Sequence, residues 1–493
     1  MSSQILASRV FTVEDQQQFA ELSGDFNPMH LDAVAARRTP AGERVVHGMH
    51  GLLWSLEQLA HITDLRRICA INADFSQFIY VNEPVTLTIL KQTDQQLMFE
   101  LRVEGTRVAA TSLRLGARAA HSGNLVEQIS GAALAFDDFA IDLPFDDLAR
   151  AHGRIEYFTT GNRISSAFPA LDDGIGTDRI TSLMSLTRLV GMAVPGVHSV
   201  FHRVNVNFVE QDSSPGALHF AVSSAEERFK ILNIRLVADG LAGSVKASMR
   251  TPPVTQPSMT ELKALVAADE FQGHTAFIVG GSRGLGELTA KLIASGGGRV
   301  IISYSVGKLD ADKIVADIKL HGGQAETLHF DARVSPSIQL DQLPALIDSV
   351  YYFATERISS RPLAQFSFGL FKSFADIYID SFNELIQALR RRSDNPISAF
   401  YPSTIAILDR PANMTEYAMA KAAGEVLCAD LARFTHGLAI EIVRLPRLST
   451  DQTASIMPME THDAISVMLP IIRRVHSAFE PNQNSSTILS NAG

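Results

Sequence analysis

The sequence has few of the features that mark secreted, metal-binding or membrane proteins. Its 493 residues include two cysteines, Cys69 and Cys428, which lie far apart and without metal-ligand spacing. This predicts reduced thiols in a cytoplasmic protein, and no metal site. No stretch reaches the roughly 18 consecutive apolar residues of a membrane helix, and residues 1–10 lack the charged start and apolar run of a signal peptide. We therefore expect a soluble protein with no membrane partner.

Basic charge is also in short supply. The chain has 43 lysines and arginines against 53 aspartates and glutamates, which gives a net charge of −10 and a pI near 5.8. This balance argues against nucleic acid as a partner. Hydrophobic residues make up 46% and charged residues 19% of the chain, as in ordinary folded proteins. A chain of this length predicts about three domains.

The stretch SGDFNPMHLD, residues 23–32, carries the strongest candidate site. In it, Asp25 and His30 are separated by a segment that contains Asn27 and Pro28. Proline disfavours a helical conformation in the residue before it, so this segment can turn and bring the carboxylate and the imidazole to one small volume. Such a pair can hold a water molecule and move its protons near neutral pH.

A second short motif, VVHGMHG at residues 45–51, opens an apolar run that predicts a helix. Gly48 lies at the predicted start of this helix. A glycine there offers a bare backbone N–H, assisted by the helix dipole, to a developing oxyanion.

Together the two motifs resemble the MaoC-like, R-specific enoyl-thioester hydratases, whose site reads S-x-D-x-N-P-x-H followed by a V-H-G-M helix start. The resemblance covers residues 1–120 or so. It implies a hot dog fold, in which a curved antiparallel sheet wraps around one helix, with Asp25 and His30 as the catalytic pair and Gly48 as the oxyanion glycine. Without the resemblance, Asp25 would be read as a turn cap and His30 as an ordinary core histidine.

An apolar helix followed by long strands occurs a second time before the proline-rich segment at residues 251–257. We therefore predict a double hot dog: a catalytic copy at residues 1–125 and a second copy at residues 126–255. The second copy lacks the D-x-N-P-x-H string, so we expect it to shape an acyl tunnel without chemistry of its own. A divergent second site near LDDG, residues 171–174, is the open alternative.

The last part, predicted as a domain at residues 260–493, alternates strands and helices. This pattern is typical of an α/β Rossmann-type, doubly wound parallel sheet. An apolar strand at residues 275–279 leads into GGSRGLG at residues 280–286, which is followed by a helix. Glycines in that position let backbone amides approach a pyrophosphate at the helix N-terminus.

This part resembles the short-chain dehydrogenase/reductases, whose motifs are T-G-x-x-x-G-x-G and Y-x-x-x-K. The second motif reads YAMAK here, and one helical turn separates Tyr417 from Lys421, so that the ammonium can depress the pKa of the phenol. The resemblance implies that Lys421 also binds the nicotinamide ribose. Tyr417 would then give its proton to the alkoxide as hydride arrives. Ser403 and Thr404 are the two candidates for the family's catalytic serine.

The residues near the predicted nucleotide site favour NADP(H) as the cofactor. An acidic residue after the second strand would bind the 2′-hydroxyl of NAD, but Tyr304 and Ser305 stand there, with Lys308 nearby and Arg283 in the glycine loop. Asp331 matches the family's adenine-contacting aspartate. The predicted cofactor-binding residues are Gly280, Ser282, Arg283, Gly284, Leu285, Gly286, Ser305, Asp331, Ala354, Tyr417 and Lys421.

Several positions of this part depart from the reductase pattern. Val279 replaces a threonine, YFAT at residues 352–355 replaces N-N-A-G, and Asp380 stands where the family has a helix asparagine. These departures keep open the alternative that the reductase domain is degenerate. It would then be a nucleotide-binding or scaffold module that serves a lone hydratase.

The leading hypothesis is a bifunctional 3-oxoacyl-thioester reductase and 3-hydroxyacyl-thioester dehydratase in fatty-acid- or polyketide-like biosynthesis. Its expected partner is an acyl-CoA or acyl-carrier-protein thioester, and a homo-oligomer is expected. The arginines at residues 390–392 could meet an acidic carrier or a CoA phosphate, although a charge run is usually a solvated face. A hydroxyacyl dehydrogenase that prefers NAD is a third hypothesis.

Overall fold

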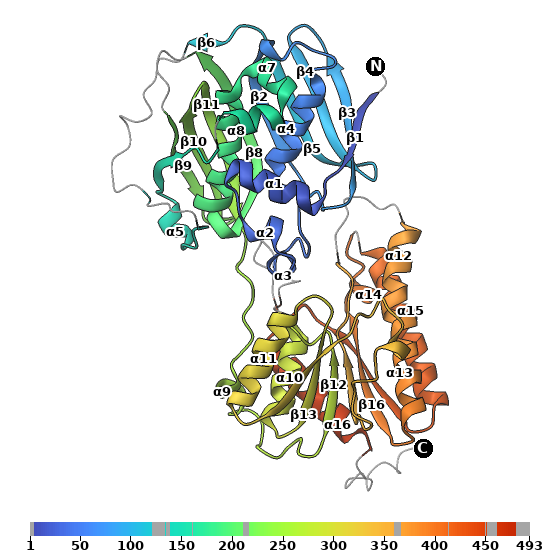
Figure 1. The fold of residues 1–493 in the computed structure, drawn as a ribbon. Coiled ribbons are helices and arrows are strands. Elements are labelled where there is room, and N and C mark those ends of the chain that lie inside the picture. The colour runs from blue at the N-terminus through green and yellow to red at the C-terminus, as the bar shows by residue number, and fades with distance from the viewer. Residues whose placement is uncertain are drawn as a thin grey trace, which may run out of the picture. The chain divides into compact units, whose positions relative to one another are not determined.

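The chain is described by a computed structural model (Figure 1). The structure describes residues 4–120, 134, 139–159, 161–210, 216–358, 366–412, 414–448, 450 and 461–479. It contains two compact units, which meet in sequence between Pro252 and Pro253, inside the proline-rich segment. The predicted two-part layout is thus present.

One curved sheet, paired antiparallel apart from one short strand, spans the first unit. Its first five strands in spatial order are β1 (Gln4–Val10), β3 (Pro84–Gln92), β4 (Gln96–Val103), β5 (Thr106–Leu115) and β2 (Ile68–Phe75). The next five are β8 (Ser199–Glu210), β11 (Leu241–Met249), β10 (Ile231–Ala238), β9 (Ala217–Glu226) and β7 (His152–Glu156), and the short β6 (Ala119–Ala120) lies parallel beside β8. If the five main strands of each half are numbered in chain order, both halves have the same order from the edge of the sheet to the central β2–β8 pair. The two halves are therefore mirrored about that pair.

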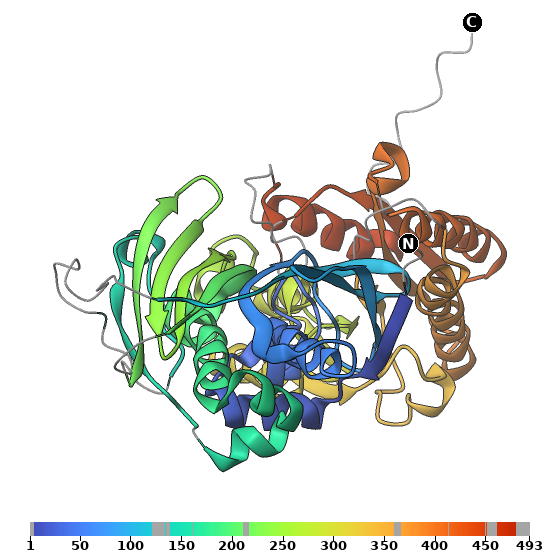
Figure 2. The ribbon, with the colours of Figure 1, turned by 90° about the horizontal axis from the view of Figure 1, so that it is seen from above.

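Helices of the first unit lie against the concave face of this sheet (Figure 2). The two longest inner helices are α4 (Gly48–Leu59) and α8 (Thr177–Arg188), which contact each other. Buried side chains surround both helices, because α4 and α8 share one hydrophobic core to which both halves of the sheet contribute. The other helices are α1 (Val13–Ser23), α2 (Pro28–Leu31), α3 (Ala33–Ala36), α5 (Phe145–Leu148), α6 (Asn162–Ala167) and α7 (Pro169–Ile175).

The end of α1 directs the chain toward the candidate site. The helix begins with a capping box between Thr12 and Asp15 and ends at Gly24, whose φ of 74° is left-handed. Glycine adopts this conformation without steric cost. A Cβ at Gly24 would also lie 2.6 Å from the ring of Phe158. This tight turn delivers Asp25 to the interior of the unit.

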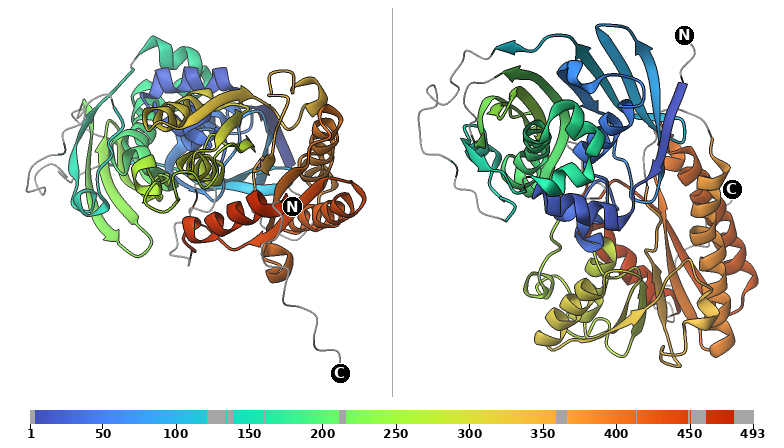
Figure 3. Two further views of the ribbon diagram at one scale, coloured as in Figure 1. Left: turned by 90° about the horizontal axis from the view of Figure 1, so that it is seen from below. Right: turned by 45° about the horizontal axis from the view of Figure 1, so that its top comes forward.

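The second unit contains six parallel strands between helices (Figures 1 and 3). Their spatial order is β14 (Gln324–His329), β13 (Arg299–Tyr304), β12 (Thr275–Val279), β15 (Ser349–Tyr352), β16 (Ile397–Thr404) and β17 (Leu438–Leu445). From β12 the chain adds β13 and β14 on one side of the sheet. It then returns and adds β15, β16 and β17 on the other side of β12. The crevice beyond the carboxyl ends of two such strands is where open α/β sheets bind ligands.

Two separate cores cover the two faces of this sheet. One contains the inner faces of α10 (Gly284–Ser295), α11 (Lys308–Leu320) and α16 (Ala464–His476), and the other those of α13 (Phe382–Arg392) and α15 (Thr415–Phe434). Both faces are buried because the strands are apolar on both sides, as parallel strands require. α12 (Phe368–Ala375) joins α13 through a π-helical turn, η6 (Asp376–Ser381); α9 (Met259–Leu262) and α14 (Ala406–Asp409) are short. None of the helices in the described ranges is long and apolar enough to cross a membrane.

Candidate active sites

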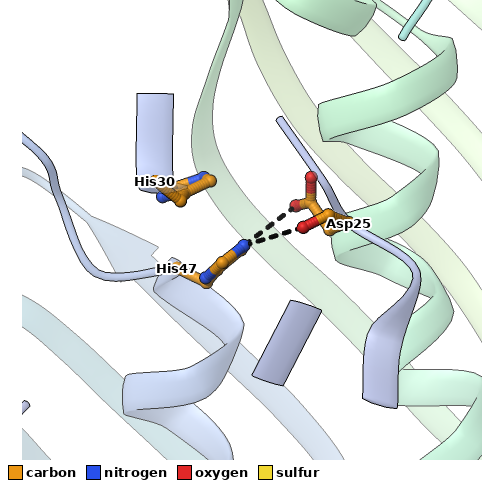
Figure 4. A group of neighbouring side chains, drawn as sticks. All are labelled: Asp25, His30 and His47. Carbon is orange, nitrogen blue, oxygen red and sulfur yellow. Dashed lines mark hydrogen bonds and ion pairs between the residues drawn. The ribbon is translucent and has the colours of Figure 1, made fainter. Parts of the chain in front are cut away.

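Asp25, His30 and His47 meet at one buried point of the first unit (Figure 4). One nitrogen or carboxylate oxygen from each lies within 4.8 Å of the others. The residues are 1%, 8% and 0% exposed, respectively. The structure thus brings together the carboxylate and the imidazole that the sequence motif suggested as a pair, and adds a second imidazole.

The asparagine and the proline of the motif explain how this geometry forms locally. Pro28 is the first residue of α2, and the side chain of Asn27 caps the helix by accepting the Met29 N–H at 3.1 Å. His30 lies on this short helix, while the Asn27 N–H donates to Asp25 Oδ1 at 3.1 Å. The amide of Asn27 also donates to the carbonyl oxygen of Gly191 at 2.9 Å. The motif is therefore anchored to the second half of the unit.

His47 is a site residue that the sequence analysis missed, although it lies in the VHG string. Its Nε2 is 3.1 Å from the backbone oxygen of Asp25 and 3.9 Å from Asp25 Oδ2 (Figure 4). Its Nδ1 and its backbone N–H are 3.0 and 3.1 Å from Gln16 Oε1. The ring stacks on that of His30 with centroids 3.7 Å apart. A metal ion at this point would have to displace these hydrogen bonds, so the donor set fits proton transfer better.

The second half of the unit supplies two further contacts to Asp25. The hydroxyl of Thr187, on α8, donates to Asp25 Oδ2 at 2.6 Å. Gly191 lies on the π-helical turn η3 (Leu189–Ala193) that continues α8. A Cβ at Gly191 would lie 2.2 Å from Asp25 Oδ1. No sequence motif signalled either residue, because both act on a group more than 160 positions away.

Burial dominates the electrostatics of this group. It raises the pKa of Asp25, while the nearby His30 and the Thr187 hydrogen bond lower it. It lowers the pKa of His30, which the Asp25 charge raises in turn. Burial and the neighbouring His30 hold the pKa of His47 well below its usual range. Both members of the pair are thus pushed toward their uncharged forms, which are an acid that can donate a proton and a base that can accept one.

The tautomer of His30 follows from its hydrogen bond. Nδ1 is 2.8 Å from the carbonyl oxygen of Val45, and a carbonyl oxygen can only accept, so Nδ1 carries the proton of the neutral ring. Nε2 is then the basic nitrogen. Gly48 follows His47 as the first residue of α4, which leaves its N–H outside the hydrogen bonding of the helix. The Phe75 ring lies 3.4 Å from the position of a Cβ on Gly48.

The glycine motif of the second unit joins β12 to α10. Gly280, Ser282 and Arg283 lie in the turn between them, and Gly284, Leu285 and Gly286 are the first residues of α10. Gly280 and Gly284 have φ values of 76° and 56°. A Cβ at Gly286 would lie 2.4 Å from the Gly280 oxygen, and one at Gly280 would lie 3.0 Å from the Ala354 nitrogen. Backbone approach and a helix N-terminus fit a nucleotide pyrophosphate.

The structure also shows the surroundings of the other residues near the predicted nucleotide site. Ser305 is exposed directly after β13. The carboxylate of Asp331 accepts two hydrogen bonds from the guanidinium of Arg333, at 2.9 and 3.0 Å. Lys308 pairs with Asp312 at 2.6 Å. An adenine amino group would therefore share Asp331 with Arg333.

Ser403 and Thr404 face different neighbours, as side chains on successive strand residues do. The hydroxyl of Ser403 donates to Glu425, which also forms an ion pair with Arg444 at 2.7 Å. A side-chain hydrogen bond with Thr404 lowers the pKa of Tyr417. Of the two candidates, Thr404 is therefore the one that touches the tyrosine.

Tyr417 and Lys421 lie on α15, but the expected influence of the lysine on the phenol is wrong. Burial raises the pKa of Tyr417, and Thr404 is the group that opposes this shift. Burial also lowers the pKa of Lys421 to about 7. The Lys421 ammonium donates to the Pro402 oxygen at 2.8 Å and lies 3.8 Å from the centroid of the Tyr378 ring. These contacts hold the ammonium at Pro402 and Tyr378 instead of at the Tyr417 phenol.

Two suggestions from single residues change with the structure. Asp380, expected where the family has an asparagine, is exposed, and Tyr378 is the residue of η6 that meets Lys421. Arg390 and Arg392 donate to backbone oxygens within the second unit, including those of His436 and Leu343. These two arginines therefore have structural roles rather than presenting a free basic patch.

Comparisons with known proteins bear on both units. The family described as MaoC like domain matches residues 4–112. Residues 4–112 are a MaoC-like domain. The mitochondrial 3-hydroxyacyl-(acyl-carrier-protein) dehydratase of Arabidopsis thaliana is 48% identical to this chain over 42 residues, which are 8% of the chain and 25% of the dehydratase.

A reductase is similar to a further stretch of the chain. The 3-oxoacyl-(acyl-carrier-protein) reductase of Synechocystis sp. is 37% identical over 70 residues, 14% of this chain and 28% of that protein. The chain thus spans about a quarter of the length of these curated relatives. The solved structure of a dehydrogenase/reductase from Sinorhizobium meliloti 1021 aligns with 44% of this chain. The alignment covers 91% of that protein, at 20% identity and a TM-score of 0.36. The predicted resemblance to a MaoC-like domain fused to a short-chain dehydrogenase/reductase is confirmed.

Proposed function

We propose that the chain is a bifunctional enzyme that reduces a 3-oxoacyl thioester and dehydrates the resulting 3-hydroxyacyl thioester. The observation that carries the proposal is the buried Asp25–His30 pair. The Asn27 N–H and the Thr187 hydroxyl both donate hydrogen bonds to the Asp25 carboxylate. Its relatives include a dehydratase and a reductase that are both named for acyl-carrier-protein thioesters. The second half of the MaoC-like unit serves this site without a catalytic pair of its own.

Dehydration assigns opposite tasks to the two side chains. His30 Nε2, the basic nitrogen, takes the proton from the carbon next to the thioester carbonyl. Asp25, whose pKa is raised by burial, gives its proton to the departing hydroxyl, which leaves as water. The Gly48 N–H stabilises the charge on the thioester oxygen while the C–H and C–O bonds break. Hydration uses the same groups in reverse.

Reduction belongs to the second unit. The glycine loop fits a nicotinamide dinucleotide, which supplies hydride when bound; NADP(H) is favoured because Ser305 and not an acid follows β13. Gly280, Gly284 and Gly286 would hold the pyrophosphate and Lys421 the nicotinamide ribose. Tyr417 would donate its proton to the alkoxide oxygen, helped by the hydrogen bond with Thr404.

The finer assignments belong to the same proposal. Residues 1–125 and 126–255 are two hot dog copies, which the mirrored strand order supports, and residues 260–493 are a Rossmann-type NADP-binding domain. The hydratase is R-specific, the carrier is CoA or acyl-carrier protein, and the pathway is biosynthesis of the fatty-acid or polyketide kind. Self-association is expected of both parts.

The test uses two thioesters and two variants of the full chain. The wild type should hydrate a crotonyl thioester and should oxidise NADPH with an acetoacetyl thioester. Asp25→Asn should lose the first activity alone and Tyr417→Phe the second alone. Full activity of either variant on its own reaction would remove that assignment.

A lone hydratase with a non-catalytic nucleotide-binding part is the second candidate. The departures from the reductase pattern at residues 279, 352–355 and 380 favour it. It predicts hydration without NADPH oxidation at any acyl chain length. NADPH binding without turnover would select this candidate.

A further inference from the structure

Tyr378 contacts both members of the tyrosine–lysine pair. It is fully buried on η6, and its ring centroid lies 3.8 Å from Lys421 Nζ. The same ring meets Tyr417 edge-on, with centroids 5.9 Å apart at 71°. One aromatic side chain therefore contacts both groups that would act on a substrate and a cofactor.

Tyr378 is itself firmly held. Its hydroxyl is 2.5 Å from Thr355 Oγ1, and its backbone oxygen accepts from the Tyr401 hydroxyl at 3.2 Å. Phe374 stacks on its other side at 5.7 Å. Thr355 takes the place of the last glycine in the N-N-A-G string. This departure from the reductase pattern is thus in direct contact with Tyr378.

Lys421 is satisfied in an unusual way for a buried cation. Its ammonium has three N–H donors, and one goes to the Pro402 oxygen at 2.8 Å. The faces of Tyr378 and Tyr401, at 3.8 and 4.9 Å, lie beside the charge. Ring faces attract a cation electrostatically but accept no strong hydrogen bond. Donors that do not bond to Pro402 thus stay available to the hydroxyls of a ribose.

We propose that Tyr378, fixed by Thr355, is a positioning residue that holds the Lys421 ammonium for the nicotinamide ribose. The inference rests on the proposed reductase function and gives the departure at Thr355 a role. It predicts that the ring of Tyr378 matters more than its hydroxyl. The ring touches the ammonium, whereas the hydroxyl acts only through Thr355.

The test compares Tyr378→Leu, Tyr378→Phe and Thr355→Val in the full chain, with Tyr352→Phe as the control. Tyr352 is an equally buried tyrosine whose hydroxyl donates to the Ile377 oxygen at 2.9 Å. NADPH dissociation constants are measured by cofactor fluorescence between pH 6 and 9, together with KM and kcat. Tyr378→Leu should weaken NADPH binding tenfold or more and move the bend of the binding profile to lower pH, because the ring face that attracts the Lys421 ammonium is lost. Tyr378→Phe and Thr355→Val should each weaken NADPH binding about threefold, and the control should match wild type.

Each outcome decides a different claim. An unchanged dissociation constant and pH profile in Tyr378→Leu would overturn the inference. If Tyr378→Leu does not fold, unchanged NADPH binding in both Tyr378→Phe and Thr355→Val would overturn it instead. If wild type binds NADPH but does not oxidise it, the reductase function fails while the binding series still judges Tyr378. Absence of NADPH binding in wild type would overturn both.

Discussion

The Asp25 site and the Tyr417 site solve the problem of a buried ionisable pair differently. Around Asp25, polar groups do the work: Thr187, Asn27 and His47 lie within hydrogen-bond distance of its carboxylate or backbone. Around Tyr417 and Lys421, aromatic rings take that role. Hydrogen bonds fix both the position and the protonation of a group, whereas ring faces fix position and leave donors free. The first arrangement suits a water molecule, and the second suits a ribose.

Among changes at the first site that keep Asp25 itself, the largest effect is expected from filling the space beside its carboxylate. Gly191→Ala places a methyl group 2.2 Å from the present position of Asp25 Oδ1, so the carboxylate must move. A displacement of about 1 Å can cost a factor of about 100 in rate. Hydration of a crotonyl thioester should fall at least that far while NADPH oxidation is unchanged. Equal losses of both activities would show that the variant disturbs more than this site.

At the second site, Thr404→Val should reduce NADPH oxidation by about 10–100-fold, since it removes the hydroxyl that favours proton loss from Tyr417. Ser403→Ala is the matched control on the same strand, because its hydroxyl serves Glu425. The control should retain its rate within about threefold. The reverse order of effects would assign the catalytic hydroxyl to Ser403.

A smaller effect tests whether the second half of the first unit matters to the chemistry of the Asp25 site. Thr187→Val keeps the shape of the side chain but removes its 2.6 Å hydrogen bond to Asp25. Loss of one hydrogen bond to an uncharged group costs about 0.5–1.5 kcal/mol, so hydration should slow by about 2–10-fold. Thr181→Val, on the same helix, removes a hydroxyl bonded only to the Thr177 oxygen. That variant should match wild type; equal slowing of both would refute a role specific to Thr187.

The buried histidines predict how the first unit responds to acid. Burial lowers the pKa of His30, His47 and His50, the last to about 3. Below pH 6.5 the unfolded chain therefore binds more protons than the folded unit, so the free energy of unfolding decreases as the pH is lowered. Each histidine contributes about 1.4 kcal/mol per pH unit once it is fully charged in the unfolded state. The sole tryptophan, Trp54, is buried in this unit, so its fluorescence during urea unfolding at pH 7 and 5 measures the loss. Equal stability at the two pH values would contradict the prediction.

The sequence predicted most of the first site because that geometry is local. Asn27 and Pro28 build the turn between Asp25 and His30 from neighbouring residues, so a contiguous string was enough. Thr187 and Gly191 could not be found this way, since only packing of α8 on the motif brings them to Asp25.

At the second site, spacing was less reliable. Ser403 and Thr404 are adjacent in sequence but differ in partner, and a strand's alternation decides which one meets Tyr417. Asp380, which stands where the family has a helix asparagine, is exposed, and Tyr378 is the residue of the π-helical turn η6 that contacts Lys421. The alternation of strands and helices was clear from apolar runs, but no local pattern reports such a turn.

The most direct test of the central claim is the rate of crotonyl-thioester hydration in Asp25→Asn, measured beside NADPH oxidation by the same preparation. Asparagine keeps the size of the side chain but cannot exchange a proton. Hydration should therefore drop by a factor of about 100–10,000, with Trp54 fluorescence and NADPH oxidation as in wild type. Hydration at the wild-type rate would show that this carboxylate does not handle the water.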